Sequence, residues 1–243
     1  SFPTRRSSDL DMYAPLADKV APQVEALLAA HHEYDEVKTA LKVYPLCDGD
    51  GAVEVLHEVV PPPRPLVIFG GNYDALPVAR FAHALGWDVT LVERRPLLAA
   101  SHAEFSQHAR VVTGRAQDVL SRLAPSARTA VVVMTHNYEE DRALLRGLIE
   151  GPARYIGMLG PRRRTDRLLD ELASAGVSID AAVRARIHGP VGLDLGAGSP
   201  EEIALSIIAE VQAVTADRTG RSLNEIATAR VSSRTEPQLL VTA

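Results

Sequence analysis

Short apolar runs that recur along residues 66–159 constrain the fold of this chain most strongly. Residues 66–69 are apolar throughout, as expected for a strand buried on both faces of a parallel sheet. A helical pattern follows at 77–85, and Gly86 separates it from the next run at 89–92. Further runs lie at 111–112, 130–134 and 155–159. This alternation predicts a doubly wound, Rossmann-like α/β domain with a parallel sheet.

The chain before this domain carries a different pattern. Helical spacing predicts a helix from Pro15 to about Leu41, and residues 52–60 alternate enough to predict a strand. The segment 61–65 contains four prolines and predicts a stiff, extended connector between two domains.

The end of the α/β domain has a clear helix signal. Ser199 suits the N-cap, Pro200 the first turn, and Glu202 the reciprocal position of a capping box. This helix is predicted to continue to about Val214, whereas polar, aperiodic sequence at 217–243 predicts a flexible tail.

The first ten residues, SFPTRRSSDL, have neither the apolar core of a signal peptide nor the period of a helix or strand. Written back into codons, they match a common short-read sequencing adaptor. We therefore expect residues 1–10 to be an assembly artefact and natural sequence to continue upstream of Asp11. An ordinary disordered terminus is the alternative.

Composition excludes several classes of partner. The chain has 26 Lys and Arg against 31 Asp and Glu, so it has no overall basic field to hold nucleic acid. Its single cysteine, Cys47, cannot form an internal disulfide, which favours a reducing compartment. Apolar runs such as 130–134 are far shorter than the roughly 20 residues that span a bilayer. We expect no membrane segment.

Ligands of a doubly wound sheet bind outside the carboxyl ends of its strands. In the first such loop the candidates are Gly70, Gly71, Asn72 and Asp74. They occupy the place of a dinucleotide-binding motif, with Asn72 where the second glycine would be. Glu93 stands where a ribose-binding acid belongs, although Arg94 and Arg95 beside it could equally contact a phosphate. The alternative is a tight turn that binds nothing.

The second loop places Thr135 and His136 after the strongest strand. His136 suits a proton shuttle or a hydrogen-bonding clamp. The alternative is an exposed residue beside a helix N-cap formed by Asn137.

The third loop begins at Gly160 and leads into a helix that starts with Arg162 and Arg163. Free backbone N–H groups and adjacent guanidinium groups predict a phosphate site. A solvated, ion-paired helix face is the alternative.

The fourth loop contains Gly189, Gly192 and Asp194. Its constrained positions suggest backbone that lies close to a ligand, toward which Asp194 would direct a carboxylate. A glycine-rich turn that only packs a strand against a helix is the alternative.

Four blocks of the sequence carry a family resemblance. They are LVIFGGNYDALPVARFAHALGWDVTLVERRP, VVVMTHNYEED, YIGMLGPRRR and IHGPVGLDLGAGSPEEIALSIIAE. Their order and spacing resemble the carboxyl-terminal domain of the xanthine dehydrogenase accessory factor family, also called XdhC/CoxI. The resemblance runs from about Leu66 to Val211, within a domain that we place at 66–216.

The resemblance implies a Rossmann-like chaperone, rather than an enzyme, that binds molybdenum cofactor (molybdopterin), assists its sulfuration and delivers it to a molybdenum hydroxylase such as xanthine dehydrogenase. It implies a cytoplasmic homodimer, with a cysteine desulfurase as a further partner. The cargo is an anionic pterin with a terminal phosphate, so the glycine loop and the arginines of the third loop become phosphate sites. His136 and Asp194 would then contact the pterin or its dithiolene.

The chain departs from this family before the α/β domain. Family members carry a glycine-rich, cysteine-bearing segment there, whereas residues 11–60 resemble only the remnant of that domain. The fold and Glu93 also permit an NAD(P)-dependent oxidoreductase, which is the alternative function. Asn72 and the absence of a Tyr-x-x-x-Lys proton relay argue against it.

Overall fold

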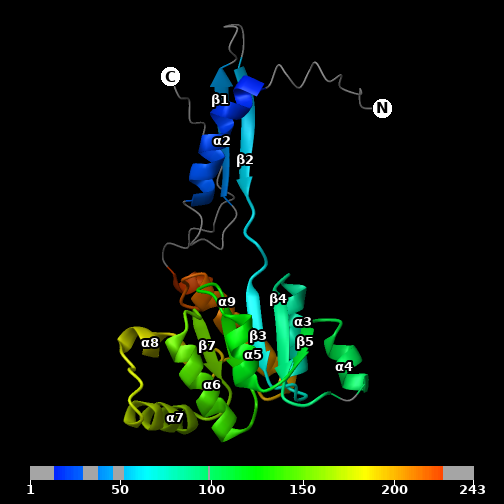
Figure 1. The fold of residues 1–243 in the computed structure, drawn as a ribbon, viewed down its shortest axis with the longest axis vertical. Coiled ribbons are helices and arrows are strands. Elements are labelled where there is room, and N and C mark those ends of the chain that lie inside the picture. The colour runs from blue at the N-terminus through cyan, green and yellow to red at the C-terminus, as the bar shows by residue number, and fades with distance from the viewer. Residues whose placement is uncertain (1–13, 30–37, 46–51, 98, 227–243) are drawn as a thin grey trace. The chain divides into compact units, whose positions relative to one another are not determined.

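The structure is a computed structural model that describes residues 14–29, 38–45, 52–97 and 99–226 (Figure 1). The chain divides into two units between Pro62 and Pro63, within the predicted connector, and each unit is described by itself. The predicted artefact at 1–10, Cys47 and most of the predicted tail lie outside the described residues. No helix in the described ranges is long and apolar enough to cross a membrane.

The first unit contains a helix and two antiparallel strands. These elements are α2 (Ala14–Ala29), β1 (Lys38–Pro45) and β2 (Ala52–Val59). Lys38 pairs with Val59 at one end of the ladder, and Pro45 pairs with Ala52 at the other. The strand predicted at 52–60 is therefore confirmed.

The helix predicted from Pro15 to Leu41 is wrong in its second part, because the chain is already a strand at Lys38. Val37 and Leu41 are four residues apart, and that spacing places two side chains on one face of a strand as well as of a helix. Backbone pairing with β2 then decides between the two structures, and this partner is not visible in local periodicity.

The second unit is built on a six-stranded parallel sheet with the order β5-β4-β3-β6-β7-β8. The strands are β3 (Pro65–Phe69), β4 (Asp88–Glu93), β5 (Arg110–Thr113), β6 (Ala130–Val133), β7 (Tyr155–Met158) and β8 (Ile187–His188). Counted along this unit, the order is 3-2-1-4-5-6, which defines a doubly wound Rossmann fold. The fold prediction and its five strands are confirmed. The sequence does not predict β8, because a two-residue strand carries no periodicity.

Helices cover both faces of this sheet (Figure 1). They are α3 (Ala75–Ala84), α4 (Ala99–Phe105), α5 (Ala116–Leu123), α6 (Tyr138–Glu150), α7 (Arg162–Ser174), α8 (Ala181–Ala185) and α9 (Pro200–Thr215), followed by the 3-10 turn η1 (Leu223–Glu225). The predicted capping box of α9 is present, since the Ser199 hydroxyl accepts from the Glu202 backbone N–H and the Glu202 carboxylate accepts from that of Ser199.

The apolar core explains why β3 lacks alternation. Leu66 and Ile68 pack in one cluster with residues of α3 and α9. Val67 and Phe69 pack in a second cluster with residues of α5, α6 and α7. Both faces of the strand are therefore removed from water, and every position after Pro65 is buried.

The connections between strands and helices define one edge of the sheet. The chain leaves β3 toward α3 and leaves the adjacent β6 toward α6, and these helices belong to opposite faces. The carboxyl ends of β3 and β6 therefore form the topological switch point, the place where ligands of such sheets bind.

Candidate functional site

The turn after β3 is shaped by the close passage of the chain after β6. Gly70 has φ +108°, and a Cβ atom there would lie 2.5 Å from the Met134 carbonyl oxygen. The Gly70 N–H donates to the Val92 carbonyl oxygen at 2.9 Å. Gly70 is thus required by the packing of three strand ends, whether or not a ligand is present.

The carboxylate of Glu93 closes this turn from the end of β4. Its Oε2 accepts a hydrogen bond from the Gly71 N–H at 2.6 Å, so this loop N–H already has a partner. A Cβ at residue 71 would lie 3.2 Å from the same oxygen. Glu93 therefore lies at the predicted position, but it is engaged inside the protein.

His136 and Asp74 face each other across the switch point. His136 Nε2 lies 3.5 Å from Asp74 Oδ2, and the His136 side chain is 55% exposed. His136 has φ +57°, in the left-handed region that non-glycine residues seldom adopt. Asp74 is the N-cap of α3 but makes no side-chain cap bond. The loops after β3 and β6 thus present a long, exposed imidazole–carboxylate contact to the crevice.

Asn137 also behaves as the sequence predicts. Its side chain accepts from the Glu140 backbone N–H at 3.1 Å and caps α6. On the other side of the crevice, Asn72 Nδ2 lies 3.5 Å from the Met134 carbonyl oxygen. Asn72 is therefore directed along the crevice between the two strand ends.

Thr135 belongs to a network around the buried Asp141 that the sequence does not predict. Its hydroxyl donates to Asp141 Oδ1 at 2.5 Å, and Arg164 Nη2 donates to Asp141 Oδ2 at 2.7 Å. The Asp141 side chain is only 3% exposed, and the Arg164 guanidinium also lies 5.2 Å from the Tyr138 ring centroid. Asp141 therefore fastens the loop after β6 to α7. The pairing joins residues 23 positions apart, which no local motif reveals.

Arg162 and Arg163 lie at the start of α7, as predicted, and both are exposed. Arg162 makes the ion pair expected of a solvated helix face, with Nε 3.5 Å from Asp166 Oδ2. Within the described residues, Arg163 has no side-chain partner. Gly160 has φ +120° and forms the turn before this helix.

The glycines of the fourth loop pack against helices. A Cβ at residue 189 would overlap Thr165 Oγ1, and one at residue 192 would lie 2.5 Å from Ser206 Oγ. The Ser206 hydroxyl donates to the Leu193 carbonyl oxygen, and the Leu193 N–H donates back to the Ser206 carbonyl oxygen. Close packing thus accounts for both glycines. Asp194 is exposed and has no partner within the described ranges.

A second polar cluster, formed by Tyr155, His188 and Glu210, lies between the sheet and α9. Glu210 Oε2 accepts from the Tyr155 hydroxyl at 2.5 Å and from the Gly192 N–H at 2.8 Å. Glu210 Oε1 lies 3.4 Å from His188 Nδ1, and the Tyr155 and His188 rings stack at 4.4 Å. We call this group the α9 cluster. The sequence does not predict it, because Tyr155 and Glu210 are 55 residues apart.

Burial and the contacts of the α9 cluster shift two pKa values in opposite directions. Burial raises the pKa of Glu210, but hydrogen bonds from His188, Tyr155 and Gly192 outweigh burial, and its pKa is lowered overall. Burial, and then the adjacent Glu210 carboxylate, raise the pKa of Tyr155 well above its ordinary value. The cluster is therefore built around an ionised Glu210 and a neutral Tyr155.

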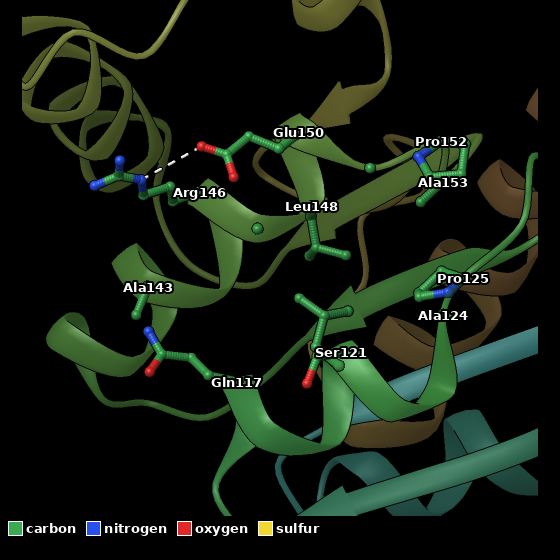
Figure 2. Close-up of a pocket in the computed structure, with 13 residues that line it drawn as sticks. Gln117, Ser121, Ala124, Pro125, Ala143, Arg146, Leu148, Glu150, Pro152 and Ala153 are labelled. Atoms are coloured by element: carbon green, nitrogen blue, oxygen red, sulfur yellow. Dashed lines mark hydrogen bonds and ion pairs between the residues drawn. The ribbon is translucent and has the colours of Figure 1, made fainter.

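An apolar cavity of about 580 Å³ lies between α5 and α6 (Figure 2). Its lining includes no residue of the crevice or of the α9 cluster. Leu120, Leu148 and Pro125 line it, and its charged lining residues, Arg146 and Glu150, are 3.4 Å apart and pair with each other. Its described lining therefore offers no unpaired cationic group to an anionic ligand. The described residues also contain no group of three or more His, Cys, Asp or Glu side chains that could hold a metal ion.

The structure therefore gathers the predicted residues unevenly. The crevice at the switch point brings together Gly70, Gly71, Asn72, Asp74, Glu93, Thr135 and His136. Arg162, Arg163 and Asp194 follow neighbouring strands β7 and β8, and no contact joins them to His136 or Asp74 in the described chain.

A doubly wound sheet with a glycine turn and polar loops at its switch point defines a Rossmann-type ligand-binding domain. Residues 66–211 match the XdhC Rossmann domain family, and the chain belongs to that family. It is 33% identical over 156 residues to a probable xanthine dehydrogenase subunit of Bacillus subtilis (strain 168), covering 64% of this chain and 44% of that protein.

Two further relatives agree with this family. The molybdenum cofactor insertion chaperone PaoD of Escherichia coli (strain K12) is 26% identical over 149 residues, covering 61% of this chain and 39% of PaoD. The crystal structure of a xanthine dehydrogenase from Bacillus halodurans superposes with a TM-score of 0.58 at 29% identity, covering 68% of this chain and 46% of that one. The chain thus spans less than half the length of these relatives.

Proposed function

We propose that this chain belongs to an accessory factor that binds molybdenum cofactor as cargo and delivers it to a molybdenum hydroxylase of the xanthine dehydrogenase type. The observation that carries the proposal is the match of residues 66–211 to the XdhC Rossmann domain. The similarity to PaoD, which is named as an insertion chaperone, supports the same function.

The chemistry of the loops suits an anionic pterin. The helix start at α7 has no side-chain cap, and Arg163 beside it has no partner in the described chain, so both are available to a terminal phosphate. The His136 and Asp74 side chains reach the crevice with a contact of 3.5 Å that a ligand could replace at little cost. These groups bind and orient, and turnover is not required of them.

We further propose two partners, a cysteine desulfurase and a second copy of this chain. A cysteine desulfurase would supply the sulfur for sulfuration, and the factor would act as a cytoplasmic homodimer. Light scattering on the purified protein tests the dimer, which a monomeric mass at micromolar concentration would exclude. Copurification with a desulfurase from a cell extract tests the sulfur source.

The oxidoreductase alternative finds less support in the crevice. One oxygen of Glu93 already accepts a hydrogen bond from the Gly71 N–H at 2.6 Å, so the carboxylate is only partly available to a ribose. Asn72 fills the position where a glycine would let a pyrophosphate approach the backbone.

The test is to purify the protein from a host that makes molybdenum cofactor and to measure pterin by fluorescence after oxidation. We expect bound pterin in the wild type and a loss of about tenfold when Arg162→Ala and Arg163→Ala are combined. A control that replaces Arg146 and Arg221, two exposed arginines that each pair with a carboxylate four residues later, removes the same charge and should retain pterin. Stoichiometric NADPH without pterin in the wild type would contradict the proposal.

A further inference from the structure

Unpaired arginine side chains gather at the carboxyl ends of β4 and β5. Arg94 and Arg95 follow β4 directly, and Arg115 immediately precedes α5. Among the residues that the structure describes, these three guanidinium groups donate no hydrogen bond and join no ion pair. Elsewhere in this unit the arginine ion pairs include Arg80–Glu104, Arg142–Glu139, Arg146–Glu150, Arg154–Asp217, Arg164–Asp141 and Arg221–Glu225.

These arginines line two cavities that share part of their walls. One cavity, of about 140 Å³, is bordered by Arg94 and Arg95 beside Glu93. The other, of about 230 Å³, is bordered by Arg94 and Arg115. Arg94 and Glu140 line both cavities, which we together call the polar hollow. Gly70, Asn72 and Thr135 of the crevice also line the smaller cavity, so the hollow adjoins the crevice at the switch point.

The charge of this hollow favours an anion. Three carboxylates line the hollow, but Glu139 is paired with Arg142 at 2.6 Å. The unpaired arginines are therefore balanced only by Glu93 and Glu140. Three positive charges against two negative ones leave a surplus of one positive charge, in a chain whose net charge is −5. One oxygen of Glu93 is moreover engaged by the Gly71 N–H, whereas the three guanidinium groups have no partner among the described residues.

The position of the hollow indicates which anion. In the strand order of this unit, β4 is the second strand, whose carboxyl end holds the ribose of a bound nucleotide. A free acid there would bind the ribose hydroxyls, whereas arginines there accommodate a phosphate on the ribose. We propose that Arg94 and Arg95, with Arg115, bind a nucleotide through a phosphate monoester on its ribose, as in an adenosine 2′-phosphate. This site goes beyond the cargo function and does not depend on Arg162 or Arg163.

The test compares three probes by isothermal titration calorimetry on the purified full chain. Adenosine 2′,5′-bisphosphate carries the ribose phosphate, adenosine 5′-monophosphate lacks it, and inorganic phosphate lacks the nucleoside. We expect the bisphosphate to bind at least about tenfold more tightly than either of the others. Arg94→Ala combined with Arg95→Ala should abolish this preference. Arg218→Ala, which removes another exposed arginine without a described side-chain partner, should preserve it.

Three results would overturn the proposal. They are equal binding of the bisphosphate and the monophosphate, no binding of either to the folded wild type, and a preference that persists in the double variant with unchanged circular dichroism. Pterin retention is measured on the same proteins, and its loss in the double variant is not expected. Failure of this site and failure of the cargo function therefore give different results.

Discussion

The crevice and the α9 cluster are built from similar side chains but differ in how those side chains are paired. In the crevice, His136 and Asp74 meet at 3.5 Å, and the imidazole is 55% exposed. In the α9 cluster, Glu210 accepts hydrogen bonds at 2.5 and 2.8 Å from Tyr155 and Gly192, and its side chain is 13% exposed. A half-buried carboxylate with several hydrogen bonds stabilises the fold, whereas exposed and loosely paired groups at a switch point are available to a ligand.

The largest effect on stability is expected from Glu210→Ala. The substitution removes the acceptor of the buried Tyr155 hydroxyl and of the Gly192 N–H, so we expect the free energy of unfolding to fall by about 3 kcal/mol. Urea denaturation followed by circular dichroism measures it. A loss below roughly 0.5 kcal/mol, the usual effect of a surface substitution, would mean that this cluster contributes no more than an exposed site.

Tyr155→Phe should have a smaller effect. The ring and its stacking on His188 are retained, and one hydrogen bond to an ionised carboxylate is lost, so we expect a decrease of about 1.5 kcal/mol in the free energy of unfolding. The same denaturation experiment measures it. The expectation fails if Tyr155→Phe destabilises the protein as much as Glu210→Ala, since the ring packing would then be the main contribution.

The stabilisation by Glu210 should also depend on pH. Its pKa is lowered in the folded state, so the stabilisation is fully present above the unfolded value of about 4.5 and is lost as the pH falls through the lower folded value. The difference in unfolding free energy between the wild type and Glu210→Gln should therefore be constant from pH 7 to about 5 and shrink below pH 4.5. A difference that grows on acidification would contradict the lowered pKa.

His136→Ala should have the smallest effect on stability. An exposed contact of this length contributes little, so we expect a change within about 0.5 kcal/mol. Unfolding curves check this value. A large loss would place His136 with the residues that hold the fold together, and it would remove the contrast between the two regions.

The same contrast separates what the sequence predicts from what it does not. The run at 66–69 predicts a strand buried on both faces, because such a strand needs apolar residues at consecutive positions. Gly70, Glu93 and His136 can be placed near the carboxyl ends of their strands, because Gly70 directly follows β3, Glu93 ends β4 and His136 lies in the loop after β6. The partners of Asp141 and Glu210 cannot be predicted, since Arg164 and Tyr155 reach them only after the sheet has formed. Likewise, the sequence does not predict β1, because the start of this strand fits a helical spacing and its partner β2 is too distant in the chain to show in local periodicity.

The roles of the two glycines in the fourth loop show a further limit. Gly189 and Gly192 are as consistent with a ligand as with packing when only the sequence is considered. Thr165 and Ser206 occupy the space that a Cβ would need, so packing alone explains them. The hypothesis of a binding loop there now depends on Asp194.

The most direct measurement compares bound pterin per folded molecule in His136→Ala and Tyr155→Phe, both purified from a host that makes molybdenum cofactor. If the crevice holds the cargo and the α9 cluster holds the fold, His136→Ala loses most of its pterin at wild-type stability, and Tyr155→Phe retains its pterin at reduced stability. Full retention in His136→Ala together with loss in Tyr155→Phe would contradict this account.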